Sequence, residues 1–398
     1  MARERPQLGR RTLVGLALAV ALIGAGCATP GGIVAELPAV AGCRTTVAPD
    51  GAASTQQIRW IRPDSPDERA ALDDWCRGVG PGVVVRNPRS TQPETESSEL
   101  EPFSRSSGEQ PVGIRPNVSR SSSVLHHVDV RTALVVISWN VNVGGGDVVG
   151  LVESLRSGAL TGQPVSRFVL LLQEAFRDGP EVPRGVLPGV RSAGAIRPRV
   201  INRERIDIVS IAETLGLALA YVPSMRNGDP GDTDEDRGNA ILSTEPLSDV
   251  RALELPFERQ RRVAIEASVR ASGPDGIPFT LRVTNVHLDN RAPAKRLWLF
   301  SSATRLRQVR GLLLALAPNV PTVVGGDFNT WYGFDDPVFN ELATTFGSEI
   351  PDDRRPTFAG LLRLDHLFFR LPDEWQATTS RIDRFGSDHH PLMARIGM

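Results

Sequence analysis

Lysine is nearly absent from this sequence: Lys295 is the only one in 398 residues, so arginine carries almost all of the positive charge. A charge excess of either sign is also absent, because the formal net charge is −1. The chain therefore lacks the global basic field that dominates many nucleic-acid binders. The arginine preference fits a compositional bias of the genome better than a preference for bidentate phosphate contacts. A hydrophobic content of 40% and a charged content of 23% are typical of a globular protein with a real core.

The sequence also lacks an apolar run that is long enough to cross a bilayer. The run Leu13–Ile23 is shorter than the ~20 residues that a spanning helix needs. It follows a basic segment that ends at Arg11, and it precedes small residues and Cys27, an order that is typical of a secretory signal. A cysteine directly after the small residues resembles a bacterial lipoprotein signal. We therefore expect residues 1–26 to be a lipoprotein signal peptide.

Cys27 would then be the lipidated first residue of the mature chain, with palmitate among its acyl groups. The protein would be exported and anchored to a bacterial membrane, on the periplasmic or outer-membrane face. The alternative is an ordinary signal peptide followed by an incidental cysteine. In both cases the mature chain is expected to leave the cytoplasm.

Cysteine is scarce, with only three residues in the chain. If Cys27 is lipidated, Cys43 and Cys76 remain as a pair in an oxidising compartment, where they can form a disulfide. This disulfide would stabilise residues 27–85, a small N-terminal extension with little core of its own. Residues 86–125 are rich in Ser, Pro, Glu and Arg and predict a flexible linker.

The remaining segment, residues 126–398, alternates strand-like and helix-like runs, and several strand-like runs end in a residue with a polar, reactive side chain. The clearest run has two glycines followed by Asp327 and Asn329, which point to one face if the chain is extended. Alone, this acid and amide read as ordinary turn residues. The same pattern recurs at the ends of other runs, at Asn140, Glu174, His287, Asp365 and Asp388 with His389. Its repetition indicates one shared site.

Histidine is also rare, and its distribution supports this interpretation. Of six histidines, four lie in these stretches: His287, His366, His389 and His390. A single histidine is commonly a hydrogen-bonded structural residue, but the joint occurrence at consecutive strand ends favours a functional site.

The ordered set of motifs resembles the endonuclease/exonuclease/phosphatase superfamily, which includes exonuclease III-type repair nucleases, DNase I, inositol polyphosphate phosphatases and neutral sphingomyelinases. The matching blocks follow the family's order from about Ala133 to the C-terminus: Ser138–Asn142, Gln173–Glu174, Gly238–Ser243, Asn285–His287, Gly326–Asn329, Leu364–His366 and Ser387–Pro391. The resemblance implies a DNase I-like, four-layer α/β sandwich in residues 126–398, with two mixed β-sheets flanked by helices and the site at one edge. It also implies hydrolysis of a phosphoester with the help of a divalent metal.

The resemblance further implies a metal site. Glu174 would be the main metal carboxylate, Asp388 a second acid near the metal, and Asn142 a further ligand. The expected ion is Mg²⁺, with Mn²⁺ or Ca²⁺ as alternatives.

The same resemblance implies the catalytic and substrate-binding groups. Asp327 would orient or deprotonate the attacking water, and Asp365 would hold the ring of the essential histidine, His389. Contacts to the phosphate oxygens and the water would come from Asn140, Asn329 and His287.

The chemistry of phosphoester hydrolysis independently favours these residue types. A hard cation with oxygen ligands neutralises the phosphate, which otherwise repels an anionic nucleophile. A carboxylate or histidine near the metal can accept the proton of the water. An imidazole that a carboxylate holds in one tautomer can stabilise negative charge on the phosphate oxygens.

The substrate stays open between two enzyme readings: a nuclease that degrades external DNA or RNA, and a phosphodiesterase that acts on phospholipid head groups. The residues after the Asp-x-Asn block, Thr330–Tyr332, argue against the inositol phosphatase branch. A loop at 331–334 suits a membrane substrate if it is exposed, but it can equally pack on the core. Three arginines, Arg259, Arg261 and Arg262, can follow a phosphate backbone or form a solvated edge.

A reading of another class is a non-catalytic binding lipoprotein of the same fold, although none of the expected acids and histidines has been lost. We expect a monomer that meets a phosphodiester substrate, either a nucleic acid or a phospholipid head group, and that contacts the membrane through its N-terminal lipid.

Overall fold

The computed structural model describes residues 33–34, 45–47, 58–86, 134–183, 205–227, 234–272, 278–290, 301–348, 351, 353–373 and 375–397. These residues belong to one compact unit, residues 31–398. None of the helices in these ranges has the length and hydrophobicity to cross a membrane. Cys27, Cys43 and residues 87–125 of the predicted linker lie outside the described ranges, so the predictions on them stay predictions.

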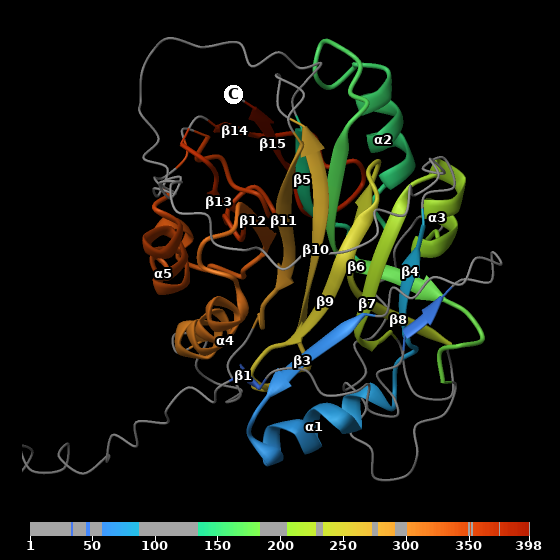
Figure 1. The fold of residues 1–398 in the computed structure, drawn as a ribbon, viewed down its shortest axis with the longest axis vertical. Coiled ribbons are helices and arrows are strands. Elements are labelled where there is room, and N and C mark those ends of the chain that lie inside the picture. Colours follow the sequence, from blue (N-terminus) through green and yellow to red (C-terminus); the bar gives the residue numbers. More distant parts are fainter. Residues whose placement is uncertain are drawn as a thin grey trace, which may run out of the picture. The chain divides into compact units, whose positions relative to one another are not determined.

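The described strands form two mixed β-sheets (Figure 1). In chain order they are β1 (Ile33–Val34), β2 (Thr45–Val47), β3 (Arg59–Pro63), β4 (Gly82–Val85), β5 (Leu134–Asn140), β6 (Phe168–Asp178), β7 (Ala218–Arg226), β8 (Glu235–Ser243), β9 (Leu247–Glu254), β10 (Val263–Ser272), β11 (Pro278–His287), β12 (Thr322–Asp327), β13 (Asp365–Arg370), β14 (Gln376–Arg381) and β15 (Leu392–Gly397). Within the described residues, one sheet has seven strands in the order β1-β3-β9-β10-β11-β12-β13. The other has eight, in the order β14-β15-β5-β6-β8-β7-β4-β2.

Helices cover the outer faces of both sheets (Figure 1). In chain order the helices are α1 (Pro66–Cys76), which contacts β3 and β7 of different sheets, α2 (Val148–Arg156), α3 (Ile208–Leu215), α4 (Ser301–Ala315), the 3₁₀ helix η3 (Gly333–Asp335) and α5 (Pro337–Phe346). Apolar side chains of α2 and α3 pack on the eight-stranded sheet, and those of α4 and α5 pack on the seven-stranded sheet. A third core lies between the sheets. The layers therefore confirm the predicted α/β sandwich.

Strand β5 illustrates how the sequence produces these layers. Successive side chains of a strand point to opposite faces. Leu134 and Val136 enter the core between the sheets, while Val135, Ile137 and Trp139 enter the core beneath the helices. An unbroken apolar run is what a strand covered on both faces requires.

Residues 58–86, from the predicted N-terminal extension, add strands to both sheets. β3 pairs in parallel with β9, and β4 pairs antiparallel with β7. Ile58, Trp60 and Cys76 lie in the core between the sheets. Cys76 is disulfide-bonded, but its predicted partner Cys43 lies outside the described residues. The described part of the extension therefore shares the core of the main domain instead of forming a separate appendage.

Candidate functional site

The polar residues that end the strands meet at one edge of the sandwich. In the register of the seven-stranded sheet, Asp327 at the end of β12 stands beside His287 of β11 and Asp365 of β13. The other sheet supplies Asn140 at the end of β5, and its Nδ2 donates to Asp327 Oδ2 at 3.0 Å. His389 comes from the loop before β15. We call these five residues, together with Asn329, the strand-end site.

Two glycines let β12 carry Asp327 into this position. A Cβ on Gly326 would lie 2.0 Å from the backbone oxygen of Val286 on the neighbouring strand. A Cβ on Gly325 would lie 2.8 Å from Leu171 Cδ1 on the opposite sheet. Only glycine fits at these two positions, because β12 lies close to the neighbouring strand at Gly326 and close to the opposite sheet at Gly325.

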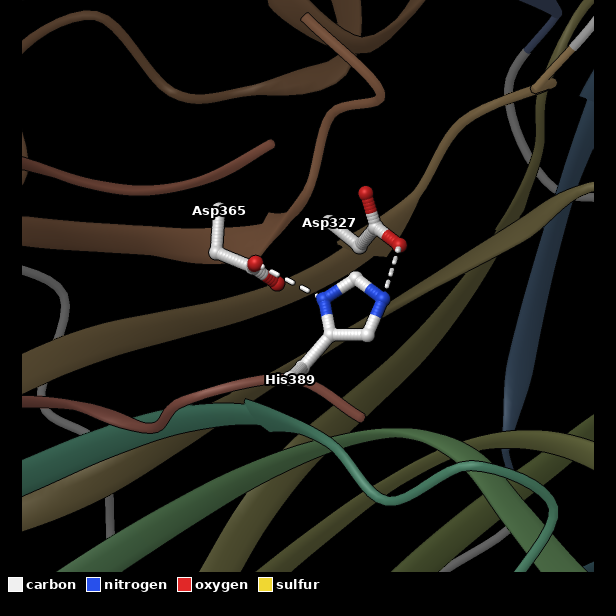
Figure 2. Close-up of side chains that lie close together, drawn as sticks. All are labelled: Asp327, Asp365 and His389. Atoms are coloured by element: carbon white, nitrogen blue, oxygen red, sulfur yellow. Dashed lines mark hydrogen bonds and ion pairs between the residues drawn. The ribbon is translucent and has the colours of Figure 1, made fainter. Parts of the chain in front are cut away.

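Asp365, His389 and Asp327 form a buried row (Figure 2). His389 Nδ1 donates to Asp365 Oδ2 at 2.8 Å, and His389 Nε2 lies 3.8 Å from Asp327 Oδ2. Burial lowers the pKa of His389, but the charges of Asp365, Asp327 and Asp388 and the hydrogen bond to Asp365 outweigh this effect and raise the pKa to about 10. The ring packs against Phe358 with centroids 4.7 Å apart, and Trp139 Nε1 donates to His389 O at 3.1 Å. The row therefore holds an imidazolium in one orientation.

Asp327 has an unusual carboxyl group. Burial raises its pKa, and the nearby charge of Asp365 raises it further. The charge of His389 and hydrogen bonds from Asn140 and Asn329 oppose this effect, which leaves the pKa at about 7. One of these bonds is donated by the Asn329 backbone N–H to Asp327 Oδ1 at 3.0 Å. A carboxyl group with this pKa can exchange a proton near neutral pH.

Asn140 and Asn329 are held in place by local hydrogen bonds. Asn140 Oδ1 accepts from the backbone N–H of Asn142 at 3.0 Å. Asn329 Nδ2 donates to Leu288 O at 3.0 Å, and its backbone has a φ of +52°, which is uncommon for a non-glycine residue. Both amides are buried and fixed before any ligand binds.

His287 is a neutral imidazole beside Asp327. Its Nε2 lies 3.5 Å from Asp327 Oδ2. Burial lowers the pKa of His287 well below its ordinary value, and the charges of Arg262, Arg237 and His389 lower it further. The site thus contains one charged and one neutral histidine.

The three predicted metal ligands, Glu174, Asn142 and Asp388, lie outside this row and are less buried than its members. Glu174 follows Gln173, the partner of Asn140 across β5 and β6. It occupies a β-bulge with a φ of +53°, and 23% of its side chain is exposed. Asn142 also has a positive φ, +50°, while Asp388 directly precedes His389 and is half-buried. A bulge re-aims a side chain, and backbone strain of this kind is concentrated at functional sites.

A divalent cation fits these donors better than it fits the buried row. Among the described residues, one group of acids and histidines has its donor atoms within 4.8 Å of one another: Asp327, Asp365 and His389. A protonated His389 whose Nδ1 is bonded to Asp365 cannot coordinate a metal. Mg²⁺ usually keeps several waters and needs only one or two protein carboxylates. Glu174 supplies one such carboxylate, and its side chain is partly exposed to solvent.

His366 and His390 belong to the matching blocks but not to the strand-end site. The Thr330 hydroxyl donates to Arg363 O at 2.7 Å, so it accepts from His366 Nε2 at 2.8 Å. The His366 ring packs among phenylalanines, and burial holds its pKa well below the ordinary value. His390 Nδ1 bonds to Ile382 O at 2.9 Å. Both histidines have structural contacts.

Two arginines lie beside the site: Arg237, for which no role was predicted, and Arg262, for which two alternatives were open. Arg237 Nη1 lies 3.8 Å from Glu174 Oε2, and Arg262 Nε lies 3.2 Å from Asp289 Oδ1. The alternative of a solvated edge is wrong for Arg261 and Arg262, because both are buried. Position was the available signal: Arg237 directly precedes the matching block Gly238–Ser243.

The loop at 331–334 is partly buried. Trp331 Nε1 donates to Asn290 O at 3.2 Å, and Phe334 packs edge-on against Phe339 with centroids 5.1 Å apart. Tyr332 is 48% exposed. The core-packing alternative therefore holds for Phe334, whereas Trp331 is only partly buried and Tyr332 is exposed.

Comparisons with known proteins identify the family of the chain. The sequence pattern of the endonuclease/exonuclease/phosphatase family matches residues 137–389, well over half of the chain. Similar solved structures include family proteins from Beutenbergia cavernae (18% identity, TM-score 0.47, 67% of this chain and 72% of that chain) and Leptotrichia buccalis (13%, 0.43, 67% and 100%). Another is sphingomyelinase C from Streptomyces griseocarneus (15%, 0.36, 66% and 99%). No match was found among curated proteins. The chain belongs to the endonuclease/exonuclease/phosphatase family of phosphoesterases, which are typically divalent-metal dependent.

Proposed function

We propose that this protein is a divalent-metal-dependent phosphodiesterase, and that it acts as a secreted or surface-anchored nuclease. The observation that carries the proposal is the row Asp365–His389–Asp327 with Asn140 bonded to its end. It combines a proton acceptor with a pKa of about 7, a fixed cation and a fixed amide. These are the groups that phosphoester hydrolysis requires.

In the proposed mechanism, Asp327 accepts a proton from the attacking water. His389 donates from Nε2 toward the negative charge that develops on the phosphate, and Asp365 keeps its ring in one orientation. The remaining neutral donors position the phosphate oxygens and the water: Asn140, Asn329 and His287. A divalent cation held by Glu174, with Asp388 and Asn142, would neutralise charge on the phosphate.

A nuclease is favoured over a phospholipid or sphingomyelin-type phosphodiesterase for two reasons. Buried Arg237 and Arg262 place positive charge next to the site, which attracts further phosphates and repels a choline cation. The packing of Phe334 against Phe339 also reduces the aromatic surface that could meet a membrane. Export through residues 1–26, the lipid on Cys27 and the monomeric state complete the proposal.

The test is a magnesium-dependent activity panel on the purified mature protein, with plasmid DNA, RNA, sphingomyelin and phosphatidylinositides as substrates. We expect DNA or RNA to be cleaved, the activity to disappear with a chelator and to return with excess Mg²⁺. Glu174→Gln should shift the Mg²⁺ dependence to higher concentration. Turnover of sphingomyelin alone would replace the nuclease proposal. Turnover of none of the four would favour the non-enzymatic binding lipoprotein.

A further inference from the structure

Arg237 is a buried cation whose charge is poorly matched. Only 8% of its side chain is exposed, and its nearest carboxylate oxygen, Glu174 Oε2, lies 3.8 Å away, beyond hydrogen-bond distance. Among the described residues, its guanidinium donates one hydrogen bond, to Met225 Sδ at 3.4 Å, and a thioether is a weak acceptor. A buried charge needs stronger partners than these. If Glu174 binds a metal cation, its charge is no longer available to Arg237.

Arg262 brings a second positive charge to the same edge. Asn239 Nδ2 on β8 donates to Val263 O on β10 at 2.6 Å, which joins the two sheets next to both arginines. Arg262 is ion-paired with Asp289, and its Nη2 donates a hydrogen bond to Gln260 Oε1 at 3.1 Å. Asp289 and Gln260 thus pair with Arg262, whereas Arg237 Nη1 lies near Glu174 without a hydrogen bond among the described residues.

The N-terminal extension anchors the strand that carries Arg237, through contacts on the opposite face of that strand. Asp236 precedes Arg237 on β8, and successive side chains of a strand point to opposite faces. Asp236 accepts from the Gly80 backbone N–H at 2.8 Å and is ion-paired with Arg177, whose Nη1 donates to Pro81 O at 2.6 Å. A Cβ on Gly80 would lie 2.3 Å from Arg177 Nη2. The strand that carries Arg237 is therefore anchored by residues outside the family match.

We propose that Arg237, supported by Arg262, forms a second anion subsite that binds the phosphate next to the scissile phosphate. The proposal rests on the proposed phosphodiesterase function and narrows its substrate to molecules with two neighbouring phosphate groups. A polynucleotide supplies them along its backbone, and a phosphorylated inositol head group supplies them around a ring. Arginine suits this role because its planar donors match phosphate oxygens bidentately.

The experiment measures binding without turnover, in the His389→Asn background with Mg²⁺ present. The ligands are a fluorescent phosphorothioate dinucleotide, with one phosphodiester, and the matching trinucleotide, with two. Arg237→Gln should weaken the trinucleotide about 10-fold to 100-fold and change the dinucleotide less than about 2-fold. Arg237→Lys, which keeps the charge, should lose less trinucleotide affinity than Arg237→Gln. Arg310→Gln, which removes a half-exposed arginine on α4, is the matched control and should change neither ligand.

Equal weakening of both ligands would overturn the subsite, because Arg237 would then act by positioning Glu174. Unchanged trinucleotide affinity in a variant with wild-type circular dichroism would overturn it as well. Inositol bisphosphate is the third ligand. If it binds in an Arg237-dependent way while neither oligonucleotide binds, the subsite stands and the nuclease proposal fails. If the protein cleaves DNA but Arg237→Gln shows no selective loss, the nuclease stands and the subsite fails.

Discussion

Two buried groups of charged side chains in this molecule differ in how well their charges are matched. The first joins the N-terminal extension to the main domain; we call it the extension seam, and it consists of Arg62, Glu254, Arg261, Arg177 and Asp236. Glu254 is ion-paired with both Arg62 and Arg261, the latter at 2.7 Å. Asp236 accepts from Arg177 Nε at 3.0 Å. Every carboxylate of the seam faces at least one guanidinium.

The strand-end site is as deeply buried but has the opposite balance. Asp327 and Asp365 stand beside each other in the register of β12 and β13, and one imidazolium, His389, serves both. Asp365 Oδ1 has no hydrogen-bond partner among the described residues. Matched buried charges hold a structure together, whereas mismatched ones shift pKa values and make proton transfer available. The buried charges of the extension seam are therefore expected to stabilise the fold, and those of the strand-end site to make proton transfer possible.

The largest expected effect comes from His389→Asn. Turnover of the phosphodiester substrate should fall by about 10²-fold to 10⁴-fold, because the fixed imidazolium is lost. The matched control is His366→Gln, which removes the other fully buried histidine of the C-terminal blocks and should lower stability while most of the turnover per folded molecule is kept. Both are read from initial rates, with thermal unfolding as the check on folding. Near-normal turnover in His389→Asn would remove the site assignment.

A substitution in the extension seam should lower the free energy of unfolding. Glu254→Gln leaves two buried guanidiniums facing a neutral amide, and removal of one partner from a buried ion pair typically costs about 3–5 kcal/mol. We expect the free energy of unfolding in urea to fall by an amount of this order. An unchanged unfolding midpoint would mean that the seam does not hold the extension.

A substitution of Asp327 tests whether the negative charge of this buried carboxylate lowers the stability of the folded protein. Its folded-state pKa is raised from 3.8 to about 7, so the stability that it contributes at low pH is lost as pH rises through about 7. Asp327→Asn should therefore raise the Tm above about pH 7 and abolish most turnover. A lower Tm for Asp327→Asn at alkaline pH would show that this carboxylate is stabilising, as Glu254 is expected to be.

The turnover of the wild-type protein should also depend on pH. It should rise as Asp327 deprotonates near pH 7 and fall as His389 deprotonates near pH 10.

The smallest effect is expected at the surface. Arg310 Nε lies 3.2 Å from Glu341 Oε1, and both side chains are largely solvated. Arg310→Gln should change the free energy of unfolding by less than about 1 kcal/mol, since exposed ion pairs contribute little. A change as large as that of Glu254→Gln would mean that burial does not distinguish the seam from an ordinary surface pair.

Much of the strand-end site could be predicted from the sequence because Asn140, His287 and Asp327 each end a strand-like run. Parallel β11 and β12 necessarily bring His287 and Asp327 to the same edge, and the antiparallel β13 begins with Asp365 at that edge. The layers followed from the same runs, since strands that are apolar on both faces must be covered on both faces.

The roles of individual arginines and histidines could not be predicted in this way. Nothing local distinguishes His366, which packs among phenylalanines, from His389, which bonds to Asp365. Arg237 looks like any other arginine in an arginine-rich chain until the fold brings it to Glu174. The pairing of the extension with the main domain could not be predicted either. It depends on contacts between residues that are far apart in the chain, such as Arg59 of β3 and Arg251 of β9.

Strand β15 lies inside its sheet, between β14 and β5, and the loop before it carries His389. The hydrogen bond from Trp139 to His389 joins residues 250 positions apart. A chain that lacks its C-terminal strand therefore contains Asn140, Glu174 and Asp327 but not His389. Under the proposed mechanism, hydrolysis would have to wait until the last strand closes the sheet, so an unfinished or truncated chain would be inactive toward phosphoesters.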